Sequence, residues 1–206
     1  MKSLNKSLWA LALLLGALIS APNVQAQGII TDGAFEWEWR GTGDVPFADF
    51  IPAATDHVYQ SWWWFRVDGA TQEEPLPWPP STEDYTNNVA TLGMTTPSFD
   101  VEIVATLTAS SATTATVTQQ LLLSNTTTAD ITVNFFKYVD YDVNGTQNSA
   151  ALFAPNHIRV SNGGEYSDLL APGANNYSVG TFGTLNADLY DANITNLTDT
   201  GLPFGP

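Results

Sequence analysis

The 206-residue sequence contains no cysteine. This absence excludes a disulfide framework, a thiol nucleophile and the lipid-modified cysteine that anchors bacterial lipoproteins. A chain of this length does not need disulfides, because domains well above ~40 residues bury enough apolar surface to fold alone. Side-chain packing must therefore hold this protein together.

Basic residues are scarce. The chain has six Lys and Arg residues against 21 Asp and Glu residues, which gives a formal net charge of −15. Binding to nucleic acid or anionic lipid depends on Lys and Arg neutralising phosphates, so neither is an expected partner. The carboxylates are scattered, and only 13% of residues are charged. This pattern favours solubility through charge repulsion, with cation binding as the alternative.

Only one long hydrophobic run is present. It extends from Leu8 to Ile19, follows Lys2 and Lys6, and precedes a Val24-Gln25-Ala26 cleavage pattern. These features predict a secretory signal peptide over residues 1–26. The run is shorter than the ~20 residues that cross a bilayer, so we expect no transmembrane segment in the mature chain. The predicted location is the cell surface or the extracellular space, with the periplasm as the alternative.

Alternation of apolar and polar residues is the dominant pattern in the rest of the chain. In Phe35–Arg40 the aromatic side chains fall on one face of the predicted strand and the charged side chains on the other. The Thr-rich stretch between Thr106 and Thr132 also favours strand, because β-branched residues resist helix. The predicted strands are 35–40, 58–67, 99–107, 117–123, 131–143, 158–160 and 177–182.

Turn sequences such as Asn144-Gly145 separate these strands, as in an antiparallel meander. The sequence therefore predicts an all-β fold, a single antiparallel β-sandwich of the Ig-like or jelly-roll-like kind over residues 27–206. Helix is expected only near 185–192, and the proline-rich stretch 73–80 is expected to be a loop outside any sheet. Because Pro203–Pro206 is not typical of a finished strand, we expect the domain to lack its last strand or strands.

The most distinctive stretch is Trp62-Trp63-Trp64-Phe65 within the strand 58–67. Alternation places Trp62 and Trp64 on one face, which leaves two interpretations. The strand packs in the core between two layers, or Trp62, Trp64 and Arg66 form a ligand site in which the indoles stack on sugar rings. If the strand is buried, Arg66 needs a carboxylate partner, and Glu36 or Glu38 could supply it.

Asp140, Asp142 and Asn144 match the opening of a calcium-binding loop, in which alternate oxygens converge on the ion. The twelfth position of such a loop should be Glu but is Ala151, so this is not an EF-hand. The three residues are candidate calcium ligands completed by a distant carboxylate. The alternative is a hairpin between 131–143 and 146–153 with Asn144-Gly145 in a type I′ turn.

No catalytic motif is recognisable. The sequence has no Gly-x-Ser-x-Gly elbow and no phosphate-binding loop, and its two histidines, His57 and His157, lack zinc-ligand spacing. We expect both histidines to be structural or on the surface. The sequence thus favours a protein that is not an enzyme and has no catalytic residues, with a polysaccharide hydrolase as the third alternative.

Three segments carry a resemblance to a known family: Asp56–Val67, Leu123–Thr126 and Phe136–Asp142. They resemble segments of exported bacterial β-sandwich proteins of the PEP-CTERM type, although the sorting tail of that family is absent. The resemblance implies an envelope or extracellular-matrix protein of exopolysaccharide-forming bacteria, with polysaccharide or other envelope proteins as partners. The expected function is a secreted, non-enzymatic surface or matrix component. The alternative is a carbohydrate- or calcium-binding module, so the expected cofactor is none, or calcium.

Overall fold

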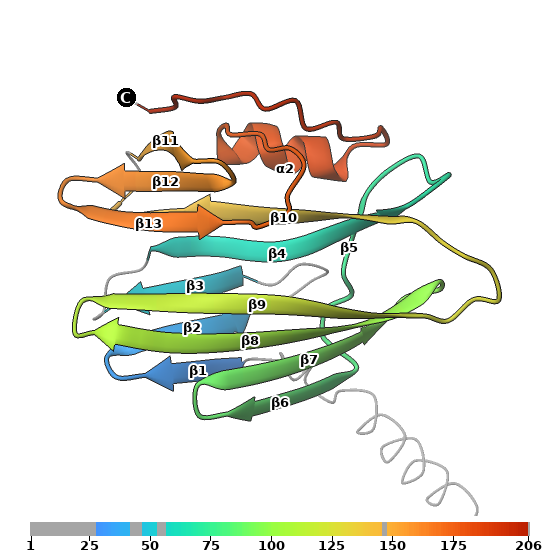
Figure 1. Ribbon diagram of the computed structural model, residues 1–206, viewed down its shortest axis with the longest axis horizontal. Coiled ribbons are helices and arrows are strands. Elements are labelled where there is room, and N and C mark those ends of the chain that lie inside the picture. Colours follow the sequence, from blue (N-terminus) through green and yellow to red (C-terminus); the bar gives the residue numbers. More distant parts are fainter. Residues whose placement is uncertain (1–27, 42–46, 53–56, 146–147, 206) are drawn as a thin grey trace, which may run out of the picture.

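The computed structural model describes residues 28–41, 47–52, 57–145 and 148–205. The described part consists of three antiparallel β-sheets and one α-helix (Figure 1). The all-β, sandwich-like fold predicted from the sequence is therefore confirmed. The predicted signal peptide, residues 1–26, lies outside the described residues. Among the helices of the described part, none is long and apolar enough to cross a membrane.

The central sheet has the order β1-β2-β3-β4-β10, and a short strand, β5, also pairs with β4. Along β2, Phe35, Trp37 and Trp39 are all buried, as the alternation predicts for a strand with one face in the core. The strands are β1 Gly28–Asp32, β2 Phe35–Arg40, β3 Phe47–Pro52, β4 Val58–Val67, β5 Glu74–Pro75 and β10 Val133–Tyr141.

The front sheet is a meander with the order β6-β7-β8-β9. Its strands are β6 Thr82–Thr86, β7 Val89–Thr95, β8 Phe99–Ser111 and β9 Thr114–Asn125. In β8 the apolar residues Val101, Ile103 and Leu107 are buried, while Asp100 and Glu102 are exposed. This alternation places the apolar face of β8 against the central sheet, where most of the core lies.

The third sheet is also a meander, with the order β11-β12-β13. Its strands are β11 Ser149–Ala154, β12 His157–Asn162 and β13 Glu165–Leu170, and the helix α2 Phe182–Tyr190 follows. Val143, Ala150 and Val160 form a small second core beneath this sheet. Phe204 pairs with Ala150 through two backbone hydrogen bonds, so the end of the chain covers the outer edge of β11.

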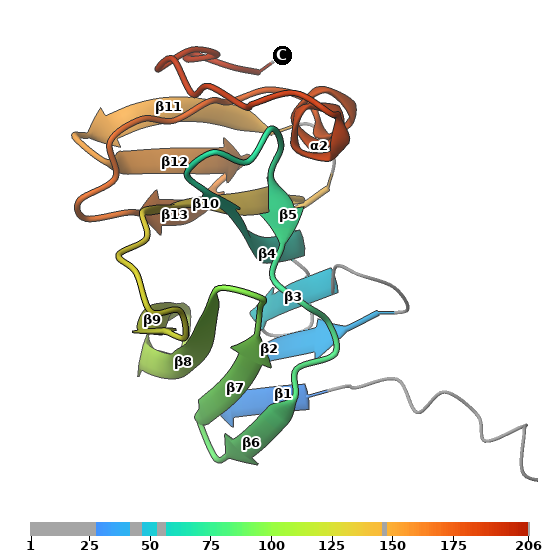
Figure 2. The same cartoon turned by 90° about the vertical axis from the view of Figure 1, so that its right-hand side faces the viewer.

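β4 lies between two layers. In Figure 2 the strands β11 and β12 and the helix α2 lie above β4, and the front sheet lies below it. The side chains agree: Phe65 packs edge-to-face on Phe99 of β8 at 5.0 Å, whereas Trp64 packs on Tyr190 of α2 at 4.5 Å. The sequence alternative in which 58–67 is a central strand, apolar on both faces, is therefore the one that the structure has.

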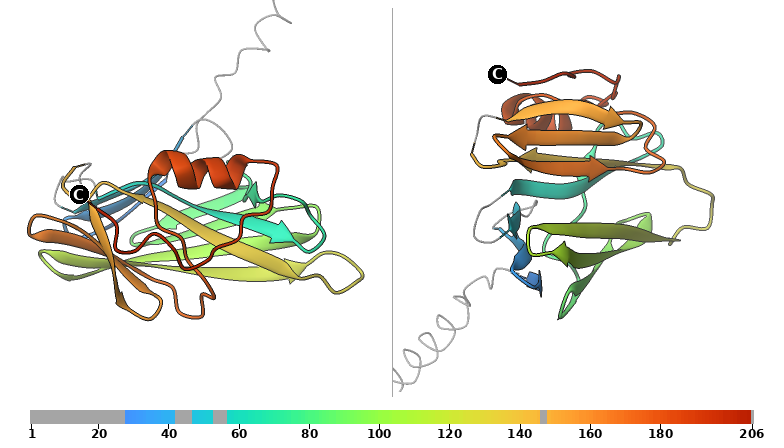
Figure 3. Two further views of the ribbon diagram at one scale, coloured as in Figure 1. Left: turned by 90° about the horizontal axis from the view of Figure 1, so that it is seen from above. Right: turned by 60° about the vertical axis from the view of Figure 1, so that its left-hand side comes forward.

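The front sheet and the central sheet are hydrogen-bonded to each other at the β1 side. The Thr31 amide donates to the Asn87 carbonyl at 3.2 Å, and Asp32 accepts from the Ala109 amide at 2.8 Å. Gly28 lies so close to the Tyr85 ring that a Cβ atom would have no room. On the other side, the long β8–β9 hairpin runs along the flank of the molecule (Figure 3).

Three local predictions are wrong. β10 and β11 do not form a hairpin, because β10 pairs with β4 while β11 belongs to the third sheet. Residues 177–181 are not a strand; a single bridge joins Ser178 to Thr200 before α2 begins. Glu74 and Pro75 do enter a sheet as β5, where proline is tolerated because β5 lies at an edge. The predicted helix near 185–192 corresponds to α2.

Replacing Trp62 with alanine tests the packing of β4. Trp62 is 1% exposed, so Trp62→Ala should lower the free energy of unfolding by about 3–5 kcal/mol. Ile29, which is 43% exposed, provides the control: Ile29→Ala should cost less than about 1 kcal/mol. Urea unfolding followed by circular dichroism measures both. Equal losses in the two variants would contradict the central position of β4.

Candidate functional site

Trp62 and Trp64 share one face of β4, where Trp62 packs against the segment 76–78 and Trp64 packs against α2. The Trp62 Nε1 donates to the Leu76 carbonyl at 2.8 Å, and the Trp62 ring contacts Trp78 edge-to-face at 5.5 Å. Both Trp62 and Trp64 are 1% exposed. A sugar ring therefore has no access to either indole in this arrangement, and core packing accounts for both.

Arg66 lies on the same face, where it joins three parts of the chain. Its guanidinium forms an ion pair with Glu73, whose side chain is fully buried, and donates to the Thr195 carbonyl at 3.2 Å. The Thr195 amide in turn donates to Glu73 at 3.1 Å. The prediction that Glu36 or Glu38 partners Arg66 is wrong, because the turn after β4 brings Glu73 back over the strand.

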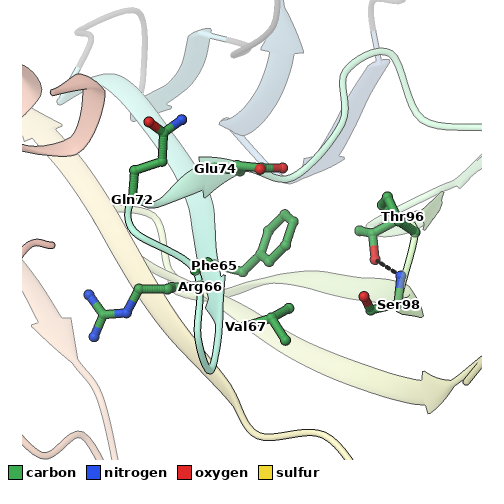
Figure 4. Close-up of a pocket in the computed structure, with 9 residues that line it drawn as sticks. Phe65, Arg66, Val67, Gln72, Glu74, Thr96 and Ser98 are labelled. Atoms are coloured by element: carbon green, nitrogen blue, oxygen red, sulfur yellow. Dashed lines mark hydrogen bonds between the residues drawn. The ribbon is translucent and has the colours of Figure 1, made fainter. Parts of the chain in front are cut away.

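A shallow groove of about 230 Å³ lies between the turn that follows β4 and the turn between β7 and β8 (Figure 4). Phe65 and Val67 provide its apolar surface, while Gln72 and Glu74 lie at its rim, and Arg66 points away from it. The polar atoms near Thr96 are already paired. The Thr96 hydroxyl donates to the Phe99 carbonyl at 2.7 Å and accepts from the Phe99 amide at 3.1 Å.

The candidate calcium ligands lie at the end of β10. Burial, and then the neighbouring charge of Asp142, raise the pKa of Asp140 to about 6. The Gly145 amide donates to the Asp142 carbonyl at 3.0 Å, and Asn162 donates to the Asn144 carbonyl at 3.1 Å. Within the described residues, no group of three or more His, Cys, Asp or Glu side chains is placed to hold a metal ion. Calcium binding here stays a prediction.

His57 connects the start of β4 to the third sheet. A hydrogen bond of 2.9 Å joins His57 Nε2 to Glu165, and one of 3.2 Å joins His57 Nδ1 to Ser167 on the same strand, β13. The ring is 7% exposed. His57 is therefore a buried histidine with both ring nitrogens paired, in agreement with the structural role expected from the sequence.

The outer face of the third sheet contains a stack that the sequence analysis missed. The Arg159 guanidinium lies 4.1 Å from the Phe153 ring centroid and 3.9 Å from the Tyr166 centroid. It also donates two hydrogen bonds, of 2.7 and 2.8 Å, to Asp168. These hydrogen bonds hold the pKa of Asp168 below its usual range. Phe153 is 60% exposed and Tyr166 is 53% exposed, so their outer surfaces face solvent.

Lys137 lies where β9 approaches the central sheet. Its ammonium group donates to the Gln119 side-chain oxygen at 3.0 Å and lies 5.0 Å from the Trp63 ring centroid. The Trp63 Nε1 donates to the same Gln119 oxygen at 2.8 Å. Burial lowers the pKa of Lys137 to about 7. The side-chain oxygen of Gln119, on β9, thus accepts two hydrogen bonds from the central sheet.

No family model, curated protein or solved structure matches the chain. Within the chain itself, the basic side chains that follow the predicted signal peptide have a common arrangement. Each one is held by the protein: Arg40 lies 3.9 Å from Glu38, and the other three are Arg66, Lys137 and Arg159 with the partners described above. Arg66, Lys137 and Arg159 therefore connect strands or layers, whereas Arg40 and Glu38 both lie on β2.

The Asp140 carboxyl should make stability depend on pH. Because its pKa is raised to about 6 in the folded chain, from 3.8, folding favours the protonated form. That stability is fully present below about pH 4 and is lost as the pH rises through about 6. Asp140→Asn, which cannot ionise, should therefore melt at a higher temperature than the wild type at pH 7.5 and at a similar temperature at pH 4.

Thermal unfolding in calcium-free buffer at both pH values measures this difference. A variant that melts below the wild type at pH 7.5 would contradict it. Repeating the melts in calcium tests the alternative site. A bound ion would raise the melting temperature of the wild type, and Asp142→Ala would abolish that rise.

Proposed function

We propose that the protein is an exported, non-enzymatic component of the bacterial surface or extracellular matrix. The observation that supports this proposal best is that its charged side chains form ion pairs and hydrogen bonds that connect the layers. Arg66 with Glu73 joins β4 to the segment near Thr195, and His57 with Glu165 joins β4 to β13. Such ties suit a rigid body that presents its surfaces to other molecules.

The buried ties hold the layers in fixed positions. Glu73 is 3% exposed and accepts from both Arg66 and the Thr195 amide, so removing the Arg66 guanidinium would leave the Glu73 charge without compensation in the interior. The aromatic contacts of Trp62 and Trp64 lie on the same face. Charge pairing and packing thus act together on the layer that covers β4.

The composition also supports a place outside the cytoplasm. The predicted signal peptide would direct export, and the net charge of −15 keeps the chain from anionic lipid and nucleic acid. The resemblance to PEP-CTERM proteins points to the same setting, an envelope rich in exopolysaccharide. None of these observations depends on which ligand, if any, the protein binds.

Fractionation of the host cells tests this proposal. Antibodies against the domain should detect it in the surface, matrix or culture-medium fractions, with the periplasm as the alternative, and not in the cytoplasm. The purified protein should release no reducing ends from acidic or neutral polysaccharides. Cytoplasmic localisation, or steady release of reducing ends that a carboxylate variant abolishes, would overturn the proposal.

A second function, contact with carbohydrate, is favoured by the outer face of the third sheet. Phe153 and Tyr166 expose ring surface, and Arg159 holds both rings in place from between them. Aromatic rings that are fixed before binding lose little conformational entropy when a flat, apolar ligand face stacks on them. We propose this stack, rather than the buried Trp62 and Trp64, as the sugar-contacting surface.

Retention on immobilised exopolysaccharide tests the carbohydrate contact. Phe153→Ala and Tyr166→Ala should each weaken retention by roughly tenfold, the effect of losing one aromatic anchor. Ile194→Ala provides the control, because Ile194 is 47% exposed but lies outside the third sheet. Unchanged retention in both aromatic variants, with folding verified by circular dichroism, would exclude this surface.

A further inference from the structure

β9 forms one edge of the front sheet. It has 12 residues, Thr114–Asn125, and pairs with β8 along its length. Within the described part of the chain, no strand pairs with its other side. Alternate residues of an edge strand direct their amide and carbonyl groups outward, so β9 offers a row of backbone donors and acceptors. Figure 3 shows this hairpin along the flank of the molecule.

The chemistry of β9 is unusual for an exposed edge. No charged residue and no proline occurs between Ile103 and Ala129, a stretch that includes all of β9. Leu122 and Leu123 are 46% and 52% exposed. Proteins usually protect edge strands with charges, prolines, bulges or a covering segment, and the middle of β9 has none of these among the described residues.

The other edge of the front sheet is different. β6 has only five residues, and two of them are the acidic Glu83 and Asp84. In the central sheet, β1 is tied to the front sheet through Thr31 and Asp32. These edges are short and are charged or hydrogen-bonded, which hinders the addition of another strand.

The remaining edges are also protected. The outer edge of β11 is paired with Phe204. β13 contains Glu165 and Asp168, and β10 contains Lys137 and Asp140. β9 is thus the long, uncharged edge among the described strands.

We propose that β9 pairs with β9 of a second copy of this chain, antiparallel and across a twofold axis, so that two front sheets become one continuous sheet. A second copy can occupy β9 because this strand has no charged residue. Two chains that each have a net charge of −15 repel one another, and an uncharged edge is where that repulsion opposes contact least.

The side chains of β9 suit pairing with themselves. The exposed face presents Thr116, Thr118 and Gln120, and threonine and glutamine can hydrogen-bond to their own kind across an antiparallel pair. A twofold axis uses the same strand from both partners, so the assembly closes at a dimer. The acidic β6 at the opposite edge prevents the sheet from growing further.

Light scattering coupled to size-exclusion chromatography tests the dimer with the mature chain, residues 27–206. The wild type should show about twice the monomer mass at high concentration. The double variant Thr118→Lys with Gln120→Lys places like charges opposite each other across the axis and should weaken dimerisation by roughly tenfold or more. Thr108→Lys is the control, because Thr108 is exposed on the inner strand β8. It should dimerise like the wild type.

Hydrogen exchange identifies the strand without any variant. Amide protection in β9 should rise with protein concentration, whereas protection in β6 should not change. A wild type that stays monomeric, or a dimer whose concentration-dependent protection lies outside β9, would overturn the proposal. If the wild type is monomeric, β9 does not pair with itself, and a strand from another protein becomes the alternative partner of this edge. Neither result bears on the proposed location or on the absence of hydrolase activity.

Discussion

The fold depends on the burial of β4 on both faces. Trp62 and Trp64 require a covering layer on one side, and Phe65 requires another on the opposite side. Burying rings of this size removes a large apolar area from water, which is the main favourable term in folding. Without the layer of α2 and the segment after β5, one of these faces would be exposed. The C-terminal part of the described chain is therefore a component of the core.

The same requirement determines the polar contacts. Arg66 extends from the buried face of β4, and a guanidinium in that position needs a carboxylate and a carbonyl oxygen nearby. Glu73 and Thr195 provide them from segments far apart in sequence. His57, at the start of the same strand, is paired with Glu165. The polar contacts that connect the layers thus start at β4, the same strand whose apolar side chains those layers cover. Packing and polar contacts therefore favour the same arrangement of layers.

Local sequence patterns predicted part of the local structure. The bounds of β2 and β4 follow from alternation, and α2 follows from helical spacing. Some local elements were not predicted, among them β1, the β6–β7 hairpin and β13. Other failures are non-local: Asn144-Gly145 does produce a turn, but the choice of sheet for β10 depends on pairing with β4, some 70 residues earlier in sequence. The Arg159 stack was missed for the same reason, since Phe153 and Tyr166 meet Arg159 only after β11, β12 and β13 pair, with a register shift near Phe153.

The contacts of β9 with the central sheet show how one buried amine can position an edge strand. β9 is held by β8 on one side, and its side chains meet the central sheet through Gln119. With a pKa lowered to about 7, Lys137 is partly neutral at physiological pH, yet both forms of the amine have N–H groups that can donate to Gln119. Trp63 donates to the same oxygen. The inner face of β9 is therefore fixed by hydrogen bonds that do not require a charge, and its outer backbone groups are held in an extended, ordered strand.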